Sequence, residues 1–305
     1  MKKVLITGGA GFIPSSLAEH LLSTGRYHVT AIDNMLTGRQ EHILQHPNYK
    51  FIKADANDYA DISAIMLYND FDYVFHYAAV VGVLRTLEHP KLVLDDIKGL
   101  QNIFELSKNT DVERIFYSSS SEVYGEPVHL PQNEHVTPLN SRLPYAVLKN
   151  IGECFCRSYH QEFGLNYTIL RFFNTYGPRQ SRDFVVSKFL DAARNNQDIT
   201  VYGDGSQTRT FCYIQDNLDF TLKILEDKLY INDVVNVGND KIVTINELAE
   251  SIIQLTGSKS KIVSLPPLKE GDMSRRQPDI EKMKMVLNRE LTPLSEGLMK
   301  VISAY

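Results

Sequence analysis

Short apolar runs alternate with stretches of helical periodicity along the first half of the chain. The apolar runs fall at residues 4–6, 28–32, 51–54, 73–76, 114–117 and 167–170. Between them, apolar residues recur every three or four positions, as at Leu17, Leu21 and Leu22. A short apolar run predicts a buried strand, and the longer period predicts an amphipathic helix. Strands that alternate with helices predict an α/β fold of the Rossmann type, which is a doubly wound parallel sheet.

A glycine-rich turn at residues 7–11 follows the first predicted strand and precedes a predicted helix. This order lets backbone N–H groups and a helix N-terminus face a pyrophosphate. The second strand ends at Asp33, about 20 residues further on, where a carboxylate binds the ribose 2′-hydroxyl of NAD and repels the 2′-phosphate of NADP. The pattern therefore predicts an NAD site that includes Gly8, Gly11 and Asp33.

Pro14 occupies the place of the third glycine of such a turn. Proline is accepted at the first position of a helix, but it lacks an N–H donor and adds bulk where helix and phosphate come closest. Two interpretations stay open. Pro14 is either a tolerated proline at a helix N-terminus or the cause of a slightly displaced pyrophosphate, linked to unusual subunit packing around the cofactor.

The ends of the later strands carry further candidates. Asp55 can bind the adenine end of the cofactor, and the small residues Ala78 and Ala79 let it approach. We expect His76 to pack within its strand. The fifth strand leads into residues 118–122, a run of four serines and a glutamate, and ligands bind outside the carboxyl ends of strands in such sheets.

Tyr145 and Lys149 lie four residues apart in a predicted helix, so their side chains share one face. A lysine ammonium beside a tyrosine favours the phenolate, which is a usable base near neutral pH. Tyr49 and Lys53 have the same spacing but fall in a predicted strand, where residues four apart do not form the helical pair. We therefore predict Tyr145 and Lys149 as the catalytic pair.

Composition excludes several classes of protein. The 305 residues carry a net charge of -5, which argues against general nucleic-acid binding. The N-terminus lacks the pattern of a signal peptide, and no apolar run has the length of a membrane span, so we expect a cytoplasmic protein. Cys154, Cys156 and Cys212 lack zinc-ligand spacing, so we expect them to pack and expect no metal site.

Motifs along nearly the whole chain closely resemble the extended short-chain dehydrogenases that modify nucleotide sugars with NAD. They lie at residues 7–13, 33–34, 121–125, 145–149, 171–179, 201–209, 236–238 and 276–280. The resemblance implies an NAD-binding Rossmann domain at residues 1–172 and a smaller C-terminal α/β domain at residues 173–305 that binds the nucleotide sugar. In this division, residues from about 211 to 238 return to the first sheet.

The resemblance also implies roles for single residues. Tyr145 would take the proton of the sugar 4-hydroxyl, Lys149 would hold the nicotinamide ribose and lower the tyrosine pKa, and Ser120 would hydrogen-bond the same sugar oxygen. The implied cofactor-binding residues, besides Tyr145 and Lys149, are Gly8, Gly11, Phe12, Ile13, Asp33, Asn34, Asp55, Ala56, Ala78, Ala79, Ser118 and Phe172. The implied substrate-binding residues are Ser121, Asn174, Gln207, Arg209 and Arg276, the arginines because guanidinium binds diphosphate oxygens.

Two more positions depart from the family pattern. Leu148 stands where a serine commonly precedes the lysine, and Asp96 stands where the family usually has asparagine. Neither change removes a catalytic group. A carboxylate only accepts hydrogen bonds, so the pattern of bonds around Asp96 must differ from that of an asparagine.

Glu122 bears on the fate of the 4-keto sugar that oxidation at C4 produces. Dehydratases and UDP-glucuronate decarboxylases of the family carry glutamate there, whereas most 4-epimerases carry a small hydroxyl or apolar residue. A carboxylate could remove the C5 proton of a 4-keto sugar. Ser121 before it resembles the decarboxylases and the GDP-mannose type of dehydratase. The segment at residues 180–186 lacks the arginine that decarboxylases place just before their paired valines. This absence argues against a decarboxylase.

We therefore expect NAD-dependent oxidation at C4 of a nucleotide-activated hexose or heptose, with the 4-keto sugar released or dehydrated, for surface polysaccharide biosynthesis. A weaker resemblance is to enzymes that oxidise GDP-heptoses for bacterial capsules. The alternatives are a 4-epimerase, a UDP-glucuronate decarboxylase and a non-catalytic dinucleotide-binding sensor. The resemblance implies a homodimer built on the helices near 91–108 and 145–163, and Pro14 keeps a homotetramer open.

Overall fold

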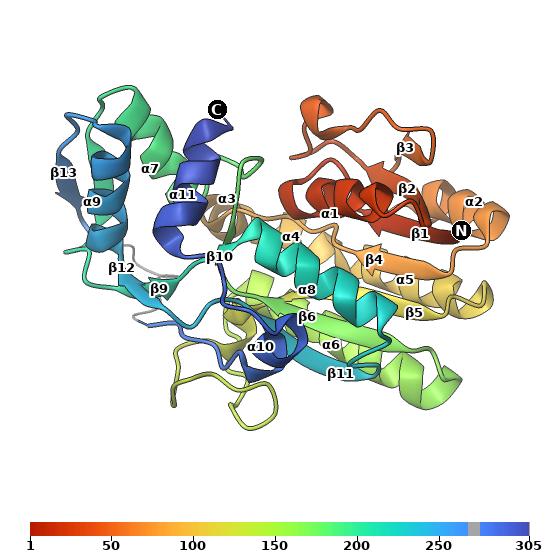
Figure 1. Ribbon diagram of the computed structural model, residues 1–305. Helices are drawn as coiled ribbons and strands as arrows, with labels where there is room; N and C mark the ends of the chain where they lie inside the picture. Colours follow the sequence, from red (N-terminus) through yellow and green to blue (C-terminus); the bar gives the residue numbers. More distant parts are fainter. Residues whose placement is uncertain (268–274, 305) are drawn as a thin grey trace. The chain divides into compact units, whose positions relative to one another are not determined.

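The computed structural model describes residues 1–267 and 275–304, apart from the side chains of residues 83 and 84. The chain forms two compact units (Figure 1). The first unit comprises Met1–Val123, Ser141–Arg171 and Thr221–Val235, and the second comprises Tyr124–Asn140, Phe172–Phe220 and Asn236–Tyr305.

A seven-stranded sheet organises the first unit, with the strand order β11-β6-β5-β4-β1-β2-β3. The strands are β1 (Lys2–Thr7), β2 (Tyr27–Asp33), β3 (Tyr49–Lys53), β4 (Tyr73–His76), β5 (Arg114–Ser120), β6 (Tyr167–Phe172) and β11 (Asp233–Val237). β1 pairs with β2 and β4, β2 with β3, and β4 with β5, all in parallel. The predicted doubly wound α/β fold is confirmed. Its strand order reverses between β1 and β4, the place where such sheets bind ligands.

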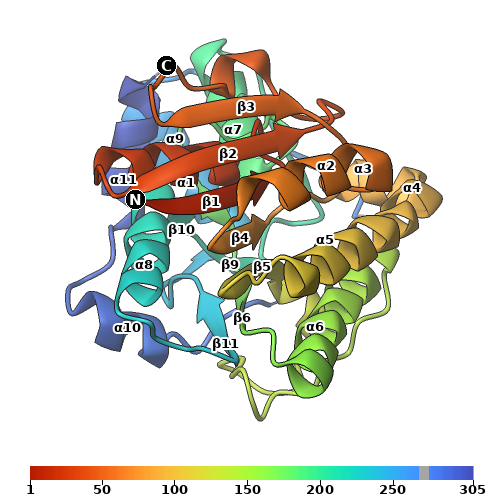
Figure 2. The same ribbon diagram turned by 90° about the vertical axis from the view of Figure 1, so that its right-hand side faces the viewer.

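Helices cover both faces of this sheet, and α2, α5 and α6 lie together on one of them (Figure 2). The helices in this part of the chain are α1 (Phe12–Ser23), α2 (Tyr59–Asn69), α3 (Val83–Glu88), α4 (Pro90–Asp95), α5 (Ile97–Asn109), α6 (Pro144–Phe163) and α8 (Ile214–Glu226). The core beneath them includes Met66 of α2, Phe104 of α5 and Leu148 of α6. Because each helix points its apolar stripe at the sheet, the helical periodicity of the sequence fixes which side chains become core.

The cysteine expectation holds only in part. Cys156 and Cys212 are buried, and burial raises the pKa of both thiols, so they pack as inert apolar side chains. Cys154 is exposed, and the expectation that it packs is wrong. It lies on the outer side of α6, two residues before Cys156, and helical periodicity turns it away from the core.

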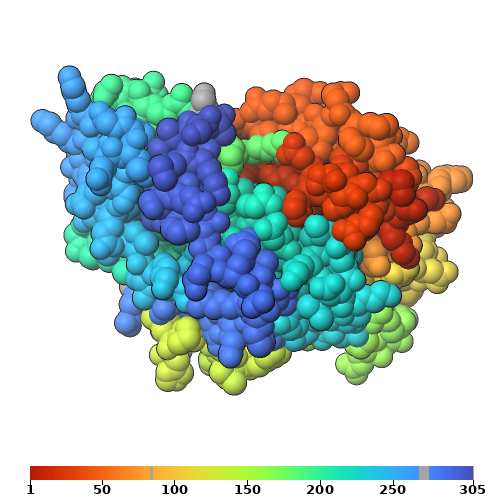
Figure 3. Space-filling model, viewed as in Figure 1, coloured from red at the N-terminus to blue at the C-terminus, as the bar shows by residue number. Residues whose placement is uncertain are grey.

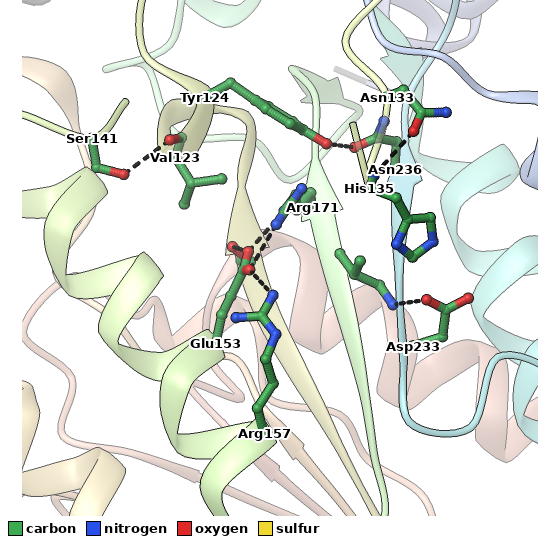
Figure 4. Close-up of polar contacts among 12 residues, drawn as sticks. Val123, Tyr124, Asn133, His135, Ser141, Glu153, Arg157, Arg171, Asp233 and Asn236 are labelled. Atoms are coloured by element: carbon green, nitrogen blue, oxygen red, sulfur yellow. Dashed lines mark hydrogen bonds and ion pairs between the residues drawn. The ribbon is translucent and has the colours of Figure 1, made fainter. Parts of the chain in front are cut away.

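A buried ion pair ties α6 to the sheet within the first unit (Figure 4). The Glu153 carboxylate accepts hydrogen bonds from Nε of Arg171 at 2.8 Å and from the Ser119 hydroxyl at 2.7 Å. Arg157, one turn along α6, donates a further bond to it at 2.9 Å. Burial alone would raise the pKa of Glu153, but the bonds and charge of Arg171 hold it below its ordinary value. Glu153 therefore joins α6 to the ends of β5 and β6.

Among the described residues, the second unit contains three short strand pairs and four complete helices, and α8 begins in it. The strands are β7 (Thr175–Tyr176), β8 (Ile199–Tyr202), β9 (Thr208–Thr210), β10 (Cys212–Tyr213), β12 (Ile242–Thr244) and β13 (Ile262–Leu265). The helices are α7 (Val185–Arg194), α9 (Ile245–Thr256), α10 (Glu281–Leu287) and α11 (Leu294–Ser303). β9 pairs antiparallel with β12, whereas β8 pairs with β13 and β7 with β10 in parallel. α9 packs against α7 and α11. α9, in light blue, and α11, in dark blue, form one continuous surface in Figure 3.

Local signals set the ends of α9. Thr244 accepts a hydrogen bond from the Glu247 N–H at 3.1 Å, and the Glu247 carboxylate accepts one from the Thr244 N–H at 2.7 Å. Gly257 ends the helix in the left-handed conformation, with φ of 62°. Thr244 and Glu247 thus form a capping box, and Gly257 is the glycine stop of the helix.

Residues 124–140 belong to the second unit, although the sequence division leaves them in the first domain. Buried Asn236 holds them there. Its side-chain oxygen accepts from the Tyr124 hydroxyl at 2.8 Å (Figure 4), and its side-chain nitrogen donates to the Gln132 carbonyl at 2.8 Å. Its backbone N–H donates to Glu134 at 2.9 Å. These partners are about a hundred residues apart in sequence, so no local pattern predicts them.

No helix within residues 1–267 and 275–304 combines the length and apolar character needed to cross a membrane.

We predict that Glu153→Ala lowers the free energy of unfolding by about 3–5 kcal/mol, because it leaves the Arg171 guanidinium buried without its carboxylate. Urea unfolding followed by circular dichroism measures this loss. Arg157→Ala is the matched control, since its partly exposed side chain contributes less than about 1 kcal/mol. Equal losses in the two variants would contradict the assignment.

Candidate active site

The glycine turn lies against the ends of β2 and β4 so closely that side chains do not fit. A Cβ on Gly8, whose φ is 72°, would lie 3.0 Å from the Ala78 backbone, and a Cβ on Gly9 would lie 2.5 Å from the Ala31 Cβ. The Gly11 N–H donates to the Gly8 carbonyl at 2.8 Å and closes the turn. The glycines are therefore required by shape as well as by conformation.

α1 begins at Phe12 directly after this turn, and its N-cap residue, Gly11, makes no side-chain cap. The first N–H groups of a helix have no partner within the helix, so those of Phe12 and Ile13 suit an anion. Pro14 is the third residue of the helix rather than the first. Its missing N–H is one that the helix would not use, so the tolerated-proline interpretation fits the structure. A displaced pyrophosphate stays a prediction.

Asp33 ends β2 with its carboxylate bound to the turn. Its two oxygens accept from the backbone N–H groups of Ala10 at 3.0 Å and Met35 at 2.7 Å. Burial raises its pKa above the ordinary value, although the two backbone bonds oppose this. Sequence reasoning missed Gly38, where a Cβ would lie 2.7 Å from an Asp33 oxygen. Each carboxylate oxygen has a second lone pair, which leaves acceptors for ribose hydroxyls.

Asp55 and Asn34 join the ends of β3 and β2. The Asn34 side-chain nitrogen donates to Asp55 at 3.0 Å, and the other Asp55 oxygen accepts from the Asn57 N–H at 2.9 Å. Ala56 lies between these two positions and is buried. The structure thus brings the predicted residues of the adenosine side together at one edge of the sheet.

His76 is a packed strand residue, as expected. The Thr7 hydroxyl accepts from the N–H groups of Tyr77 at 3.1 Å and Ala78 at 3.0 Å, so its own hydrogen is donated to Nδ1 of His76 at 2.9 Å. Burial, and after it the charge of Lys149, lowers the His76 pKa to about 3. The imidazole is therefore neutral and carries its hydrogen on Nε2.

The Lys149 ammonium lies beside the C-terminal residues of β5. Its ammonium donates to the Ser118 carbonyl at 2.7 Å and approaches the Ser118 hydroxyl at 3.3 Å. It also lies 5.3 Å from the ring centre of Tyr117 and 5.7 Å from that of Tyr145. Burial lowers the Lys149 pKa to about 8. Tyr145 is the second residue of α6, directly after Pro144, so it lies in the first turn of that helix.

Gly152 explains how α6 approaches β5 so closely. A Cβ at this position would lie 2.1 Å from the hydroxyl oxygen of Tyr117. The glycine lies one turn beyond Lys149, so the tyrosine ring fills the space where a larger residue would push the helix away. By contrast, Tyr49 and Lys53 lie on β3, and the expectation that they form no helical pair is confirmed.

Residues 118–120 end β5, and a short 3-10 turn at Ser121–Tyr124 follows directly. The Glu122 N–H donates to the Ser120 hydroxyl oxygen at 3.2 Å, and both residues lie in the short 3-10 turn or beside it. Ser121 is buried, whereas Glu122 is partly exposed. A hydroxyl that accepts from an N–H still has its own hydrogen to donate. Ser120 and Glu122 are thus held close together at the same strand end as Lys149.

The predicted substrate-binding residues other than Ser121 lie in the second unit. Asn174 donates to the Thr210 carbonyl at 3.0 Å, and Gln207 donates to the Tyr202 carbonyl at 2.9 Å. Arg209 and Arg276 are both buried, and a bridge between Thr208 and Arg275 places their segments side by side. Phe172, predicted to bind cofactor, is the last residue of β6.

The first unit fits a dinucleotide. The glycine turn has no room for a Cβ, the α1 N-terminus has no side-chain cap, and carboxylates lie at the ends of β2 and β3. When bound there, NAD supplies the acceptor for a hydride. Within the part of the chain that the structure describes, no cluster of three or more metal-ligating side chains occurs.

The doubly wound parallel sheet and the glycine turn together define a dinucleotide-binding enzyme of the Rossmann class. The sequence profile of the NAD dependent epimerase/dehydratase family matches residues 4–238, and the chain belongs to that family. It is accordingly an NAD-dependent enzyme of the group that modifies nucleotide sugars.

The chain is 36% identical over 315 residues to UDP-glucuronic acid decarboxylase 1 of Danio rerio, a match that spans all of this chain and 72% of that protein. Among solved structures, UDP-glucose 4-epimerase of Thermotoga maritima with UDP-glucose has a TM-score of 0.93 at 30% identity, over 99% of this chain and 98% of that one. UDP-glucuronic acid 4-epimerase of Bacillus cereus, in complex with UDP-glucuronic acid and NAD, has a TM-score of 0.90 at 30% identity, over 99% and 100%.

We predict that Lys149→Met stabilises the cofactor-free fold at neutral pH. The Lys149 pKa of about 8 lies below its ordinary value of 10.5, so the cost of burying the charge is present below pH 8 and disappears as the pH rises to 10.5. The difference in unfolding free energy between variant and wild type should shrink over this window by about 3 kcal/mol, at 1.36 kcal/mol per unit. Urea unfolding at stepped pH measures it. Lys53→Met, which makes the same substitution at an exposed lysine of β3, is measured beside it as the matched substitution.

Proposed function

We propose that this protein oxidises C4 of a nucleotide-activated sugar to the 4-keto sugar, with Tyr145 as the base. The observation that carries the proposal is the geometry of α6. Tyr145 lies in its first turn, and Lys149 lies one turn further with its ammonium anchored to the Ser118 carbonyl at 2.7 Å. Both groups meet at the carboxyl end of β5.

Two sources of positive charge favour the phenolate form of Tyr145. The N-terminal end of a helix favours a negative charge in its first turn, and the Lys149 ammonium 5.7 Å from the ring adds a positive charge. In this proposal the phenolate accepts the proton of the C4 hydroxyl as the C–H electron pair leaves for NAD. Lys149 has three N–H donors, so after bonding Ser118 it keeps one for a ribose hydroxyl.

Ser120 and Glu122 complete the proposed catalytic group. Since the Ser120 hydroxyl accepts from the Glu122 N–H, it can donate to the sugar oxygen at C4. The Glu122 carboxylate follows in the same turn, where it can act on the proton at C5. This placement supports release or dehydration of the 4-keto sugar over simple epimerisation, whereas the names of the relatives support 4-epimerase and decarboxylase as alternatives.

The remaining predicted residues receive binding roles in this proposal. The cofactor would lie on Gly8, Gly11, Phe12, Ile13, Asp33, Asn34, Asp55, Ala56, Ala78, Ala79, Ser118 and Phe172. Ser121, Asn174, Gln207, Arg209 and Arg276 would bind the sugar and its diphosphate.

A uridine diphosphate sugar is the substrate class that the relatives support, because their names refer to UDP-sugars. The resemblance to GDP-heptose oxidases, a role in capsular or other surface polysaccharide synthesis, and a homodimer or homotetramer remain predictions. A panel of UDP-, GDP- and dTDP-sugars, analysed by mass spectrometry of the products, tests the substrate and its fate together. Loss of hydrogen, water or carbon dioxide identifies dehydrogenase, dehydratase or decarboxylase, and unchanged mass with altered stereochemistry identifies an epimerase.

We predict that Tyr145→Phe lowers kcat by about 10²–10⁴-fold, the usual contribution of a general base, while NAD binding is kept. Initial rates with the accepted sugar and calorimetric titration with NAD measure the two effects. Tyr49→Phe is the matched control, because its tyrosine has the same spacing to a lysine but lies on β3. Full turnover in Tyr145→Phe would rule out the catalytic assignment and revive the sensor alternative.

Glu122→Gln separates the first oxidation from any later step. If the product has lost water, we predict that this variant accumulates the 4-keto sugar, because it keeps the oxidising group and lacks the carboxylate. Quenched-flow mass spectrometry follows both species. An unchanged rate of dehydration in Glu122→Gln would exclude the residue as the base at C5.

A further inference from the structure

Asp96 lies between α4 and α5 and receives hydrogen bonds at both carboxylate oxygens. One oxygen accepts from the Val80 N–H at 2.8 Å, and the other accepts from the Asn57 side-chain nitrogen at 3.1 Å. The Asn57 side-chain oxygen in turn accepts from the Gly99 N–H at 2.8 Å. The three bonds form a chain that joins the β4–α3 loop, the α4–α5 junction and the β3–α2 loop.

The direction of this chain is fixed at both ends by backbone N–H groups, which only donate. Gly99 requires the oxygen of Asn57 to face it, so the amide nitrogen of Asn57 must face residue 96. Val80 donates to residue 96 from the other side. Both side-chain atoms of residue 96 must therefore accept, which an ionised carboxylate does and an asparagine does not. These hydrogen bonds therefore require a negatively charged side chain at position 96, where the enzymes that the protein resembles usually have a neutral amide.

This charge lies near the helix that carries the catalytic pair, since α4 and α5 both pack against α6. The groups that contact Lys149 on β5 and α6 are Ser118, Tyr117 and Tyr145, all uncharged in their ordinary forms. The carboxylate of Glu153, one turn further along α6, is paired with Arg171. His76 of β4, whose own pKa is lowered in part by Lys149, is neutral. Burial lowers the Lys149 pKa, and the carboxylate of Asp96 opposes that effect.

We propose that Asp96 is a positioning residue that keeps the buried Lys149 ammonium charged at the working pH, and so sets the upper pH limit of the reaction. The proposal rests on the catalytic role of Lys149 proposed above. In this proposal the Asp96 carboxylate acts on the active site through its charge. Its side-chain hydrogen bonds go to Val80 and Asn57 and to neither member of the catalytic pair.

Two variants test the proposal. Asp96→Asn removes the charge but sets two donors against each other, so it can also weaken the fold. The double variant Asn57→Asp/Asp96→Asn restores every bond with the roles of the two side chains exchanged. The carboxylate at position 57 then accepts from the Gly99 N–H and from the amide nitrogen at position 96, whose oxygen accepts from the Val80 N–H. This variant keeps the net charge and moves it from the α4–α5 junction to the β3–α2 loop, where the carboxylate still accepts from the Gly99 N–H of α5.

The first measurement uses the cofactor-free protein. The free energy of unfolding is measured against pH for the wild type and for the double variant, each with and without Lys149→Met. In each case, the difference between the protein that keeps Lys149 and the one that carries Lys149→Met reports the titration of Lys149. In wild type this titration begins near pH 8, and we expect it to begin roughly half to one pH unit lower in the double variant. An unmoved titration overturns the proposal and leaves Asp96 a structural link.

The second measurement is the pH profile of kcat/KM with the accepted sugar. We expect the alkaline limb to move to lower pH by the same roughly half to one unit in the double variant. Asp58→Ala, which removes the side-chain cap of α2, is the control that loses stability without moving either titration. A shifted Lys149 titration with an unmoved alkaline limb overturns the catalytic role of Lys149 and the pH limit, while the coupling between Asp96 and Lys149 stands.

Discussion

The site depends on the contact between α6 and β5, where the Lys149 ammonium is buried against the Ser118 carbonyl. Two features beside it hold that contact in place. Gly152 lets the helix approach to the hydroxyl of Tyr117, and Glu153 bonds the serine that follows Ser118. The position of the two reactive side chains relative to the strand end follows from this packing, because a helix moved away from β5 would lengthen the hydrogen bonds of Lys149 and Glu153.

The same contact works against stability. A lysine whose pKa falls to about 8 through burial destabilises the folded state at neutral pH, where it remains charged. The buried pair of Glu153 and Arg171 does not simply offset this cost, since desolvation removes much of the gain from a buried ion pair. Its contribution is geometric, in that it holds α6 on the strand ends. Such strain is typical of sites that evolution selects for chemistry.

Sequence predicted those parts of the fold and site that local patterns determine. The first strand, its glycine turn and α1 are contiguous, and the helical face shared by Tyr145 and Lys149 follows from a spacing of four. The bond between Asn57 and Asp96 joins residues 39 apart, and no period or spacing announces it. The membership of residues 124–140 in the second unit depends in the same way on tertiary packing.

Transfer of deuterium from C4 tests the central claim most directly. The protein and NAD are incubated with the accepted sugar nucleotide carrying deuterium at C4, the mixture is quenched before turnover is complete, and the cofactor is analysed by mass spectrometry. If C4 is the position oxidised, deuterium appears in the reduced cofactor, and this label is lost in Tyr145→Phe. Conversion of the sugar with an unlabelled cofactor throughout would contradict oxidation at C4 and the role given to α6.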